Sequence, residues 1–159
     1  MMTGGRCYSD RMTQQDTASP PQVAVGQRFS RRHTFTPEQV MAFATAAGDT
    51  NPIHHDAALA AGTRFGGLIA SGTQSAALLL GLTASHFSDW TTVIGMGFSV
   101  NFLRGVPADA SVVSEWTVTA VQTHQGGPAQ IVEMEGEMRD AQGRMYVTAK
   151  GKVLVGAAL

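Results

Sequence analysis

Charged side chains are scarce in this sequence. Asp, Glu, Lys and Arg make up 14% of the 159 residues, and the formal net charge is -1, whereas ordinary globular domains are about one-quarter charged. Without a long basic run, the chain lacks the electrostatic footprint of nucleic-acid-binding proteins and the polybasic patch of proteins that bind anionic membranes. A small, nearly neutral domain that binds a small ligand fits better. The limited polar surface also favours an oligomer over a lone monomer.

Cysteine and long apolar runs are scarce as well. The single Cys7 cannot form an internal disulfide, which is compatible with a reducing compartment, and no secretory signal is visible. We therefore expect a cytoplasmic protein. The strongest apolar run, residues 76–82, is far shorter than the ~20 residues that a membrane-spanning helix needs.

The chain does contain one uncharged helical segment. Residues 71–87 include no Asp, Glu, Lys or Arg and are apolar on nearly every side, which predicts a helix that is buried all round. Another helix is predicted to begin at Thr36, because Thr36, Pro37 and Gln39 match the N-cap, first-turn proline and capping box of a helix start. Its apolar stripe stops at Gly48.

The length suits one domain with a single core. Residues 1–20 show no apolar period and predict a disordered tail, so the domain is expected over residues 21–159. Within it, residues 27–35 predict an edge strand, and segments with a two-residue period follow from about Thr91, including one from Ala110 to Thr123. The predicted fold class is α+β, with an antiparallel sheet wrapped around one apolar helix.

The last two predicted strands form a hairpin. Glutamates alternate with residues that face the other way between positions 132 and 138, and residues 140–143 supply the turn. A tight turn there predicts three cross-strand pairs, namely Arg139 with Arg144, Glu133 with Lys150 and Glu135 with Thr148. These neighbours suit a solvated face, so we expect the glutamates to point into solvent.

The stretch from Gly48 to Asp56 is the most informative part of the chain, because it places polar side chains on a turn that is neither helix nor strand. Gly48 can end the preceding helix, and Pro52 pushes Asn51 towards extended geometry. Asp49 and His54 could then face each other, hold one water molecule and exchange protons with its target. Alternatively, the carboxylates of the turn cap helices and His54 is a structural histidine. The spacing alone leaves both interpretations open.

Three motifs together resemble a known family. They are Phe43 with Ala47–His54 (AGDTNPIH), Thr63–Gly72 (TRFGGLIASG) and Asn101–Pro107 (NFLRGVP). In these residues the chain resembles the MaoC-like (R)-specific enoyl-CoA hydratase/dehydratase family, which has the hot-dog fold. The resemblance covers about Val25 to Val155, and the Gly-Asp-x-Asn-Pro-x-His core is its most specific part.

The resemblance implies an activity and an assembly. It implies reversible addition of water to a trans-2-enoyl-CoA thioester, giving an (R)-3-hydroxyacyl thioester, with Asp49 and His54 as the catalytic pair and with neither a metal nor another cofactor. It also implies a homodimer, or a higher homo-oligomer, whose sheets join edge to edge. The acyl chain and the pantetheine arm would enter at the subunit boundary.

Five further residues are candidates for substrate binding. Asn51 could orient the catalytic pair or donate to the thioester carbonyl, and the backbone N–H of Gly72 could stabilise negative charge at the start of the uncharged helix. Ser71 stands where the family usually has His, which leaves the substrate preference open. Arg64 and Arg104 are candidates for contacts with the phosphates of CoA. The structural alternatives are a turn-forming Asn, a helix-entry glycine and solvated arginines.

Two other functions stay possible. A hot-dog thioesterase would share the fold and the ligand, but many such enzymes carry a carboxylate on or beside the central helix, and residues 68–88 contain none. A non-catalytic subunit that binds acyl thioesters would not need the Asp-His pair. The remaining histidines (His33, His55, His86 and His124) match no metal-ligand spacing and are interpreted as surface or core residues.

Overall fold

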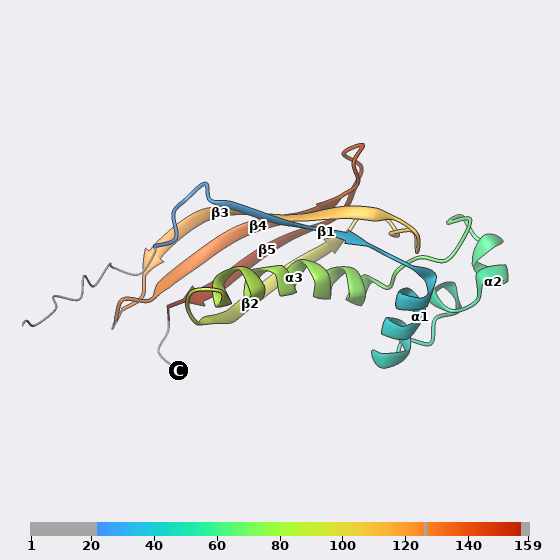
Figure 1. Ribbon diagram of the computed structural model, residues 1–159, viewed down its shortest axis with the longest axis horizontal. Coiled ribbons are helices and arrows are strands. Elements are labelled where there is room, and N and C mark those ends of the chain that lie inside the picture. The colour runs from blue at the N-terminus through green and yellow to red at the C-terminus, as the bar shows by residue number, and fades with distance from the viewer. Residues whose placement is uncertain (1–21, 126, 157–159) are drawn as a thin grey trace, which may run out of the picture.

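A computed structural model describes residues 22–125 and 127–156 of the chain (Figure 1). Along the chain, the elements are β1 (Arg28–Thr34), α1 (Pro37–Ala46), the 3-10 turn η1 (Pro52–His54), α2 (Ala57–Ala61), α3 (Gly72–Ser88), β2 (Val93–Phe102), β3 (Ser111–Thr123), β4 (Gln130–Arg139) and β5 (Met145–Val155). The tail predicted for residues 1–20 lies outside the described residues.

The strands form one antiparallel sheet in the order β1-β3-β4-β5-β2. Figure 1 shows α3 running along one face of this sheet, with α1 and α2 beyond one end of that helix. The predicted arrangement of an antiparallel sheet around one helix is therefore confirmed. The strand predicted at residues 27–35 is β1, and it lies at an edge as expected.

Trp116 joins the sheet to the helix. Its side chain is fully buried, and its indole Nε1 donates a hydrogen bond of 2.8 Å to the carbonyl oxygen of Leu79 in α3. Gly136 on the neighbouring strand leaves room for the ring, because a Cβ atom there would lie 2.7 Å from it. The large apolar residue thus packs closely and its one polar atom is satisfied.

The prediction that α3 is buried all round is wrong. Its sheet-facing residues, such as Leu79 and Phe87, are fully buried, but Thr73, Ala77, Gly81 and Ala84 are exposed along the opposite side. A single sheet covers only one side of a helix. The helix lacks charged residues because its other side carries small uncharged ones. No helix in the described ranges is long and apolar enough to cross a membrane.

The predicted hairpin register is also wrong. The structure pairs Arg139 with Met145, Glu133 with Lys152 and Glu135 with Lys150. The turn occupies residues 140–144, where the Asp140 carboxylate accepts from the N–H groups of Gln142 and Arg144, and an irregularity lies between Met138 and Arg139. The partner of Arg139 moves by one position, and beyond the irregularity the partners of Glu133 and Glu135 move by two, which changes their neighbours but leaves the glutamates on their face.

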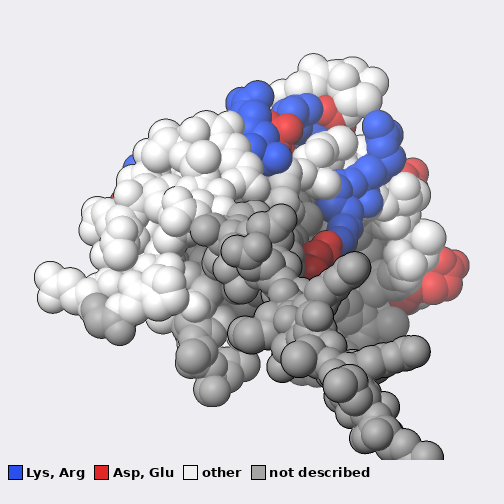
Figure 2. All heavy atoms as spheres, turned by 60° about the vertical axis from the view of Figure 1, so that its left-hand side comes forward, with Lys and Arg blue, Asp and Glu red and all other residues white. Residues whose placement is uncertain are grey.

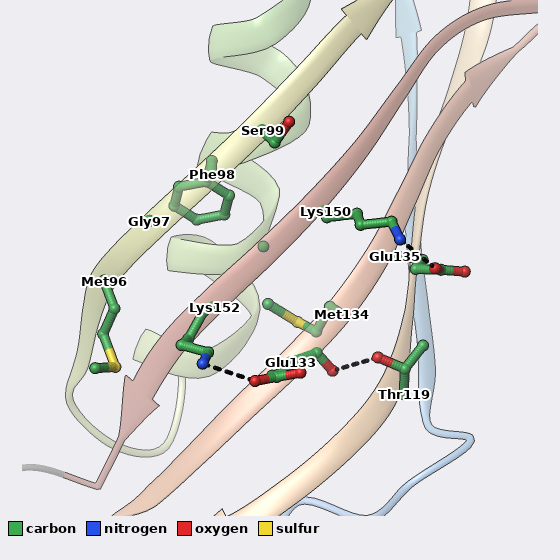
Figure 3. Close-up of a pocket in the computed structure, with 11 residues that line it drawn as sticks. Met96, Gly97, Phe98, Ser99, Thr119, Glu133, Met134, Glu135, Lys150 and Lys152 are labelled. Carbon is green, nitrogen blue, oxygen red and sulfur yellow. Dashed lines mark hydrogen bonds and ion pairs between the residues drawn. The ribbon is translucent and has the colours of Figure 1, made fainter.

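The outer face of the sheet carries the glutamates, as predicted. Lys152 Nζ lies 2.7 Å from Glu133 Oε1, and Lys150 Nζ lies 3.6 Å from Glu135 Oε1. Among the described residues seen in Figure 2, basic and acidic side chains lie next to one another beside an uncharged area. Figure 3 shows both ion pairs beside a groove of about 470 Å³ on this outer face.

Candidate active site

The loop after α1 holds Asp49 through several of its atoms. Gly48 adopts a positive φ of 71°, which ends the helix as predicted. The N–H of Asp49 then donates to the carbonyl oxygen of Ala44 at 2.8 Å, and Asp49 Oδ1 accepts from the N–H of Asn51 at 3.0 Å. One carboxylate oxygen is therefore used to shape the turn, and Oδ2 is left for other partners.

Asn51 has the structural role that the sequence allowed. Its Oδ1 accepts a 3.4 Å hydrogen bond from the N–H of Ile53, and it caps the short η1 turn that begins at Pro52. The side chain is exposed and is not among the residues that line the neighbouring cavity. A contact between Asn51 and a substrate stays a prediction.

His54 is buried and has a fixed orientation. Its Nδ1 lies 2.8 Å from the carbonyl oxygen of Ile69, and its Nε2 lies 3.5 Å from Asp49 Oδ2. A carbonyl oxygen can only accept a hydrogen bond, so Nδ1 carries the proton of the neutral ring. Nε2 is then an acceptor that faces a second acceptor, the Asp49 carboxylate.

This facing pair of acceptors determines what the site can do. His54 Nε2 and Asp49 Oδ2 lie 3.5 Å apart, and two acceptors this close repel each other unless a hydrogen lies near both atoms. That hydrogen is supplied by a water molecule or by a proton on one of the two groups. A water that donates one hydrogen to each acceptor keeps its own lone pairs free. The structure thus brings the two predicted catalytic residues together in an arrangement suited to activating water.

A cavity of about 730 Å³ lies beside His54. Its lining includes His54, Gly72 and three arginines, Arg64, Arg104 and Arg144, whereas no Asp or Glu is among the described residues that line it. The arginines come from three separate segments of the chain. Together they give the cavity a positive potential that attracts an anionic ligand.

The arginines differ in how they are held. Arg104 Nη1 donates a 2.7 Å hydrogen bond to the carbonyl oxygen of Met145, and the Arg64 guanidinium lies 4.9 Å from the centroid of the Phe65 ring. Arg144 is exposed like the other two, and its Nε is 4.0 Å from Asp140 Oδ2.

The Asp140 carboxylate is shared among several donors. It accepts hydrogen bonds from the backbone N–H groups of Arg144 and Gln142 and from the Tyr146 hydroxyl. These bonds, with that of Arg144 the most important, hold the pKa of Asp140 below its usual range. Burial, followed by the Asp140 charge, raises the pKa of the Tyr146 phenol, which therefore stays neutral and donates. Asp140 is thus mainly a turn residue, and Arg144 retains capacity for another anion.

Sequence reasoning missed Arg144. It lies about 40 residues from Arg104 and about 80 from Arg64 along the chain. It lines the cavity because the β4–β5 turn lies beside the end of β2. A basic residue after a turn normally signals only a solvated hairpin tip. No local pattern distinguishes it, so only the pairing of β2 with β5 reveals its position.

Ser71 and Gly72 form the start of α3 and have separate roles. Ser71 is fully buried, and its Oγ accepts from the N–H of Gln74 at 3.2 Å, so it caps the helix and does not line the cavity. Gly72 does line the cavity, and a Cβ atom there would lie 3.2 Å from the Phe102 ring. A direct contact of Ser71 with substrate stays a prediction.

Residues 18–138 match the family model described as "MaoC like domain". The chain belongs to this family. No curated protein matches the sequence at a significant level.

Solved structures of MaoC-like proteins have the same fold. The (R)-hydratase from A. caviae involved in PHA biosynthesis is 30% identical and has a TM-score of 0.73, over 82% of this chain and 96% of that one. The MaoC-like dehydratase from Rhodospirillum rubrum is 27% identical, with a TM-score of 0.72 over 86% and 95% of the two chains. R-hydratase PhaJ1 from Pseudomonas aeruginosa is 25% identical, with a TM-score of 0.74 over 86% and 84%. The predicted family and hot-dog fold are thereby confirmed.

Proposed function

We propose that this protein adds water reversibly to a trans-2-enoyl-CoA thioester and forms an (R)-3-hydroxyacyl thioester. The observation that carries the proposal is the 3.5 Å separation between Asp49 Oδ2 and His54 Nε2, with His54 Nδ1 tied to a carbonyl oxygen. Both reactive atoms are then acceptors that can hold a single water. The similarity to an (R)-hydratase from A. caviae at 30% identity supports the same reaction class.

In the proposed reaction, Asp49 and His54 act together on one bound water. The water oxygen forms a bond to C3 of the enoyl group while one of its protons passes to the Asp49 and His54 pair. The C2–C3 π bond breaks, charge moves to the thioester oxygen, and C2 receives a proton from the same pair. These steps add one water across the double bond, and their reversal is dehydration.

The thioester oxygen needs a donor as its charge develops. The N-terminal turn of α3 borders the cavity through Gly72, and the first N–H groups of a helix lack partners within it. Together with the helix dipole, they stabilise a negative charge placed there. In this proposal Ser71 contributes by capping that helix and Asn51 by holding the turn that orients the catalytic pair.

The carrier group is anchored by the arginines of the cavity. Arg64 and Arg104 were predicted to contact the phosphates of CoA, and Arg144 shares the same cavity. Guanidinium groups bind phosphate oxygens through charge-assisted, often bidentate hydrogen bonds. The acyl chain would lie against the apolar part of the lining, which includes Ile69 and Phe102.

We also propose a homodimer that forms through β2. This strand is at the edge of the sheet, where it pairs with β5 alone among the described strands, and it carries no charged residue. Ile94 and Met96 are 42% and 52% exposed on it, which is unusual for an unprotected edge. Because Phe102 at the end of β2 lines the cavity, such an interface would adjoin the site. Light scattering at micromolar concentration should give at least a dimer, and a monomer would contradict this assembly.

The activity can be tested with enoyl-CoA substrates of several chain lengths. Loss of the conjugated alkene and release of free thiol are followed together, and the configuration of the product is determined. Alkene loss without thiol release supports hydration, and an (S) product would contradict the stated stereochemistry. Thiol release would instead indicate a thioesterase, whereas binding without either change would indicate a non-catalytic thioester-binding subunit.

A further inference from the structure

Two adjacent histidines, His54 and His55, follow the turn that carries Asp49, and only His54 has a role in the reaction described above. The ring of His55 is half-buried, and its Nε2 lies 2.6 Å from the backbone carbonyl oxygen of Asp49. We infer that His55 is a positioning residue that fixes Asp49 for the acid-base pair. This inference rests on the proposed function.

The chemistry of this contact requires a particular tautomer. The carbonyl oxygen of Asp49 can only accept, so Nε2 of His55 must carry a hydrogen. His54 requires the opposite arrangement, because its Nδ1 donates to the carbonyl oxygen of Ile69. Neighbouring histidines in one turn therefore carry their protons on different nitrogens, and each donates to a backbone carbonyl in a different segment.

The bond from His55 completes the support of Asp49. The N–H of Asp49 is held by the carbonyl oxygen of Ala44, Oδ1 is held by the N–H of Asn51, and the carbonyl oxygen is held by His55. Only Oδ2 is left to face His54. Fixing the peptide between Asp49 and Thr50 limits rotation about the backbone of Asp49, so the reactive oxygen stays at its distance from His54 Nε2. Acid-base catalysis depends on such a fixed separation.

The backbone around His55 does not depend on its ring. The N–H groups of His55 and Asp56 both donate to the carbonyl oxygen of Pro52, at 3.0 and 2.8 Å, and Asp56 caps α2. A change of the side chain therefore leaves the turn bonds in place. His86 makes a useful contrast, because its ring stacks on Phe29 at 3.9 Å and accordingly has a packing role away from the loop.

The test uses three substitutions of His55 that differ in whether the new side chain has an N–H donor long enough to reach the Asp49 carbonyl oxygen. The amide nitrogen of Gln can take the place of Nε2 of His, the amide nitrogen of Asn is too short, and Leu has no donor. His55→Leu and His55→Asn should each lower kcat by about 10–100-fold and leave KM within about threefold, whereas His55→Gln should retain most of kcat. His124→Gln, on an exposed histidine, is the matched control and should behave as the wild type.

A second measurement does not depend on turnover. Long-range proton–nitrogen NMR of the imidazoles should show the Nδ1–H tautomer for His54 and the Nε2–H tautomer for His55. The ring resonances of His54 should move in His55→Asn and His55→Leu and stay in place in His55→Gln.

Each outcome decides the inference. Equal kcat in the Gln and Asn variants, wild-type kcat in a folded Leu variant, or an Nδ1–H tautomer for His55 would overturn it. If the Leu variant does not fold, the Gln and Asn pair gives the answer. If the wild type hydrates no thioester, the proposed function has failed, and the NMR comparison still shows whether His55 holds Asp49.

Discussion

Two of the hollows that contain basic side chains differ in how those charges are balanced. In the groove on the outer face of the sheet, Lys150 and Lys152 each pair with a glutamate on the neighbouring strand (Figure 3). In the cavity beside His54, Arg64, Arg104 and Arg144 share the lining with no acidic residue among the described residues. The two lysines are paired with glutamates, whereas Arg64 and Arg104 form no ion pair among the described residues and so favour an anionic ligand.

The two hollows also differ in their neighbours. The outer groove is built on strand residues alone, and its lining includes Met96 and Thr119, which lie at irregularities in the pairing of β2 and β3. The cavity is bounded by the start of α3, the 3-10 turn η1 and the connections that follow α2, β2 and β4, and His54 is the member of the Asp49 and His54 pair that lines it. Function is commonly carried by such loops on a rigid scaffold. Substitutions in the two regions should therefore have very different consequences.

The largest effect is expected at the acid-base pair. Asp49→Asn keeps an oxygen that can accept from the N–H of Asn51, and it removes the basicity of the side chain. Asp49→Asn and His54→Ala should each lower turnover by about 10²–10⁴-fold, and the double variant should lose little more, because the two residues act as one unit. Turnover, thioester affinity and melting temperature are measured together. Near-wild-type turnover in Asp49→Asn would rule out the catalytic assignment.

A smaller effect is expected at the arginines. Arg104→Met should raise KM for the acyl-CoA substrate by about tenfold, which corresponds to the loss of about 1.4 kcal/mol of charge-assisted hydrogen bonding, and should change kcat little. Arg144→Met should have a weaker effect in the same direction, because its guanidinium is also near Asp140. The same thioesters on a truncated pantetheine without phosphates provide the control. If KM rises equally for those substrates, the arginines do not bind the phosphates.

The smallest effect is expected in the outer groove. Lys152→Gln and Lys150→Gln break exposed ion pairs with Glu133 and Glu135, and such pairs stabilise proteins by about 0–1 kcal/mol. The melting temperature should fall by no more than about 2–4 °C, and kcat/KM should stay within about twofold of the wild-type value. A change in KM as large as that of Arg104→Met would mean that the outer groove also serves the substrate.

Much of the molecule was predictable because its determinants are local. Thr36 caps α1 and Asp56 caps α2 as expected, since a cap involves residues only three positions apart. The alternation in β4 identified the buried face, because side chains in any strand point to opposite sides in turn. Asp49 and His54 lie on one short turn, so the sequence alone could place them near each other.

Other features depend on contacts between distant segments. The hairpin register depends on the number of turn residues, and the exposed side of α3 depends on which side the sheet covers. The position of Arg144 at the cavity depends on the pairing of β5 with β2. Even His55, six residues from Asp49, could not be assigned, because the direction of its ring is set by the folded turn. The sequence by itself determined most of the helices and strands and the proximity of Asp49 and His54 through short-range chemistry. The tertiary structure decided which charges meet at the cavity, because only packing brings residues that are far apart in the chain to the same wall.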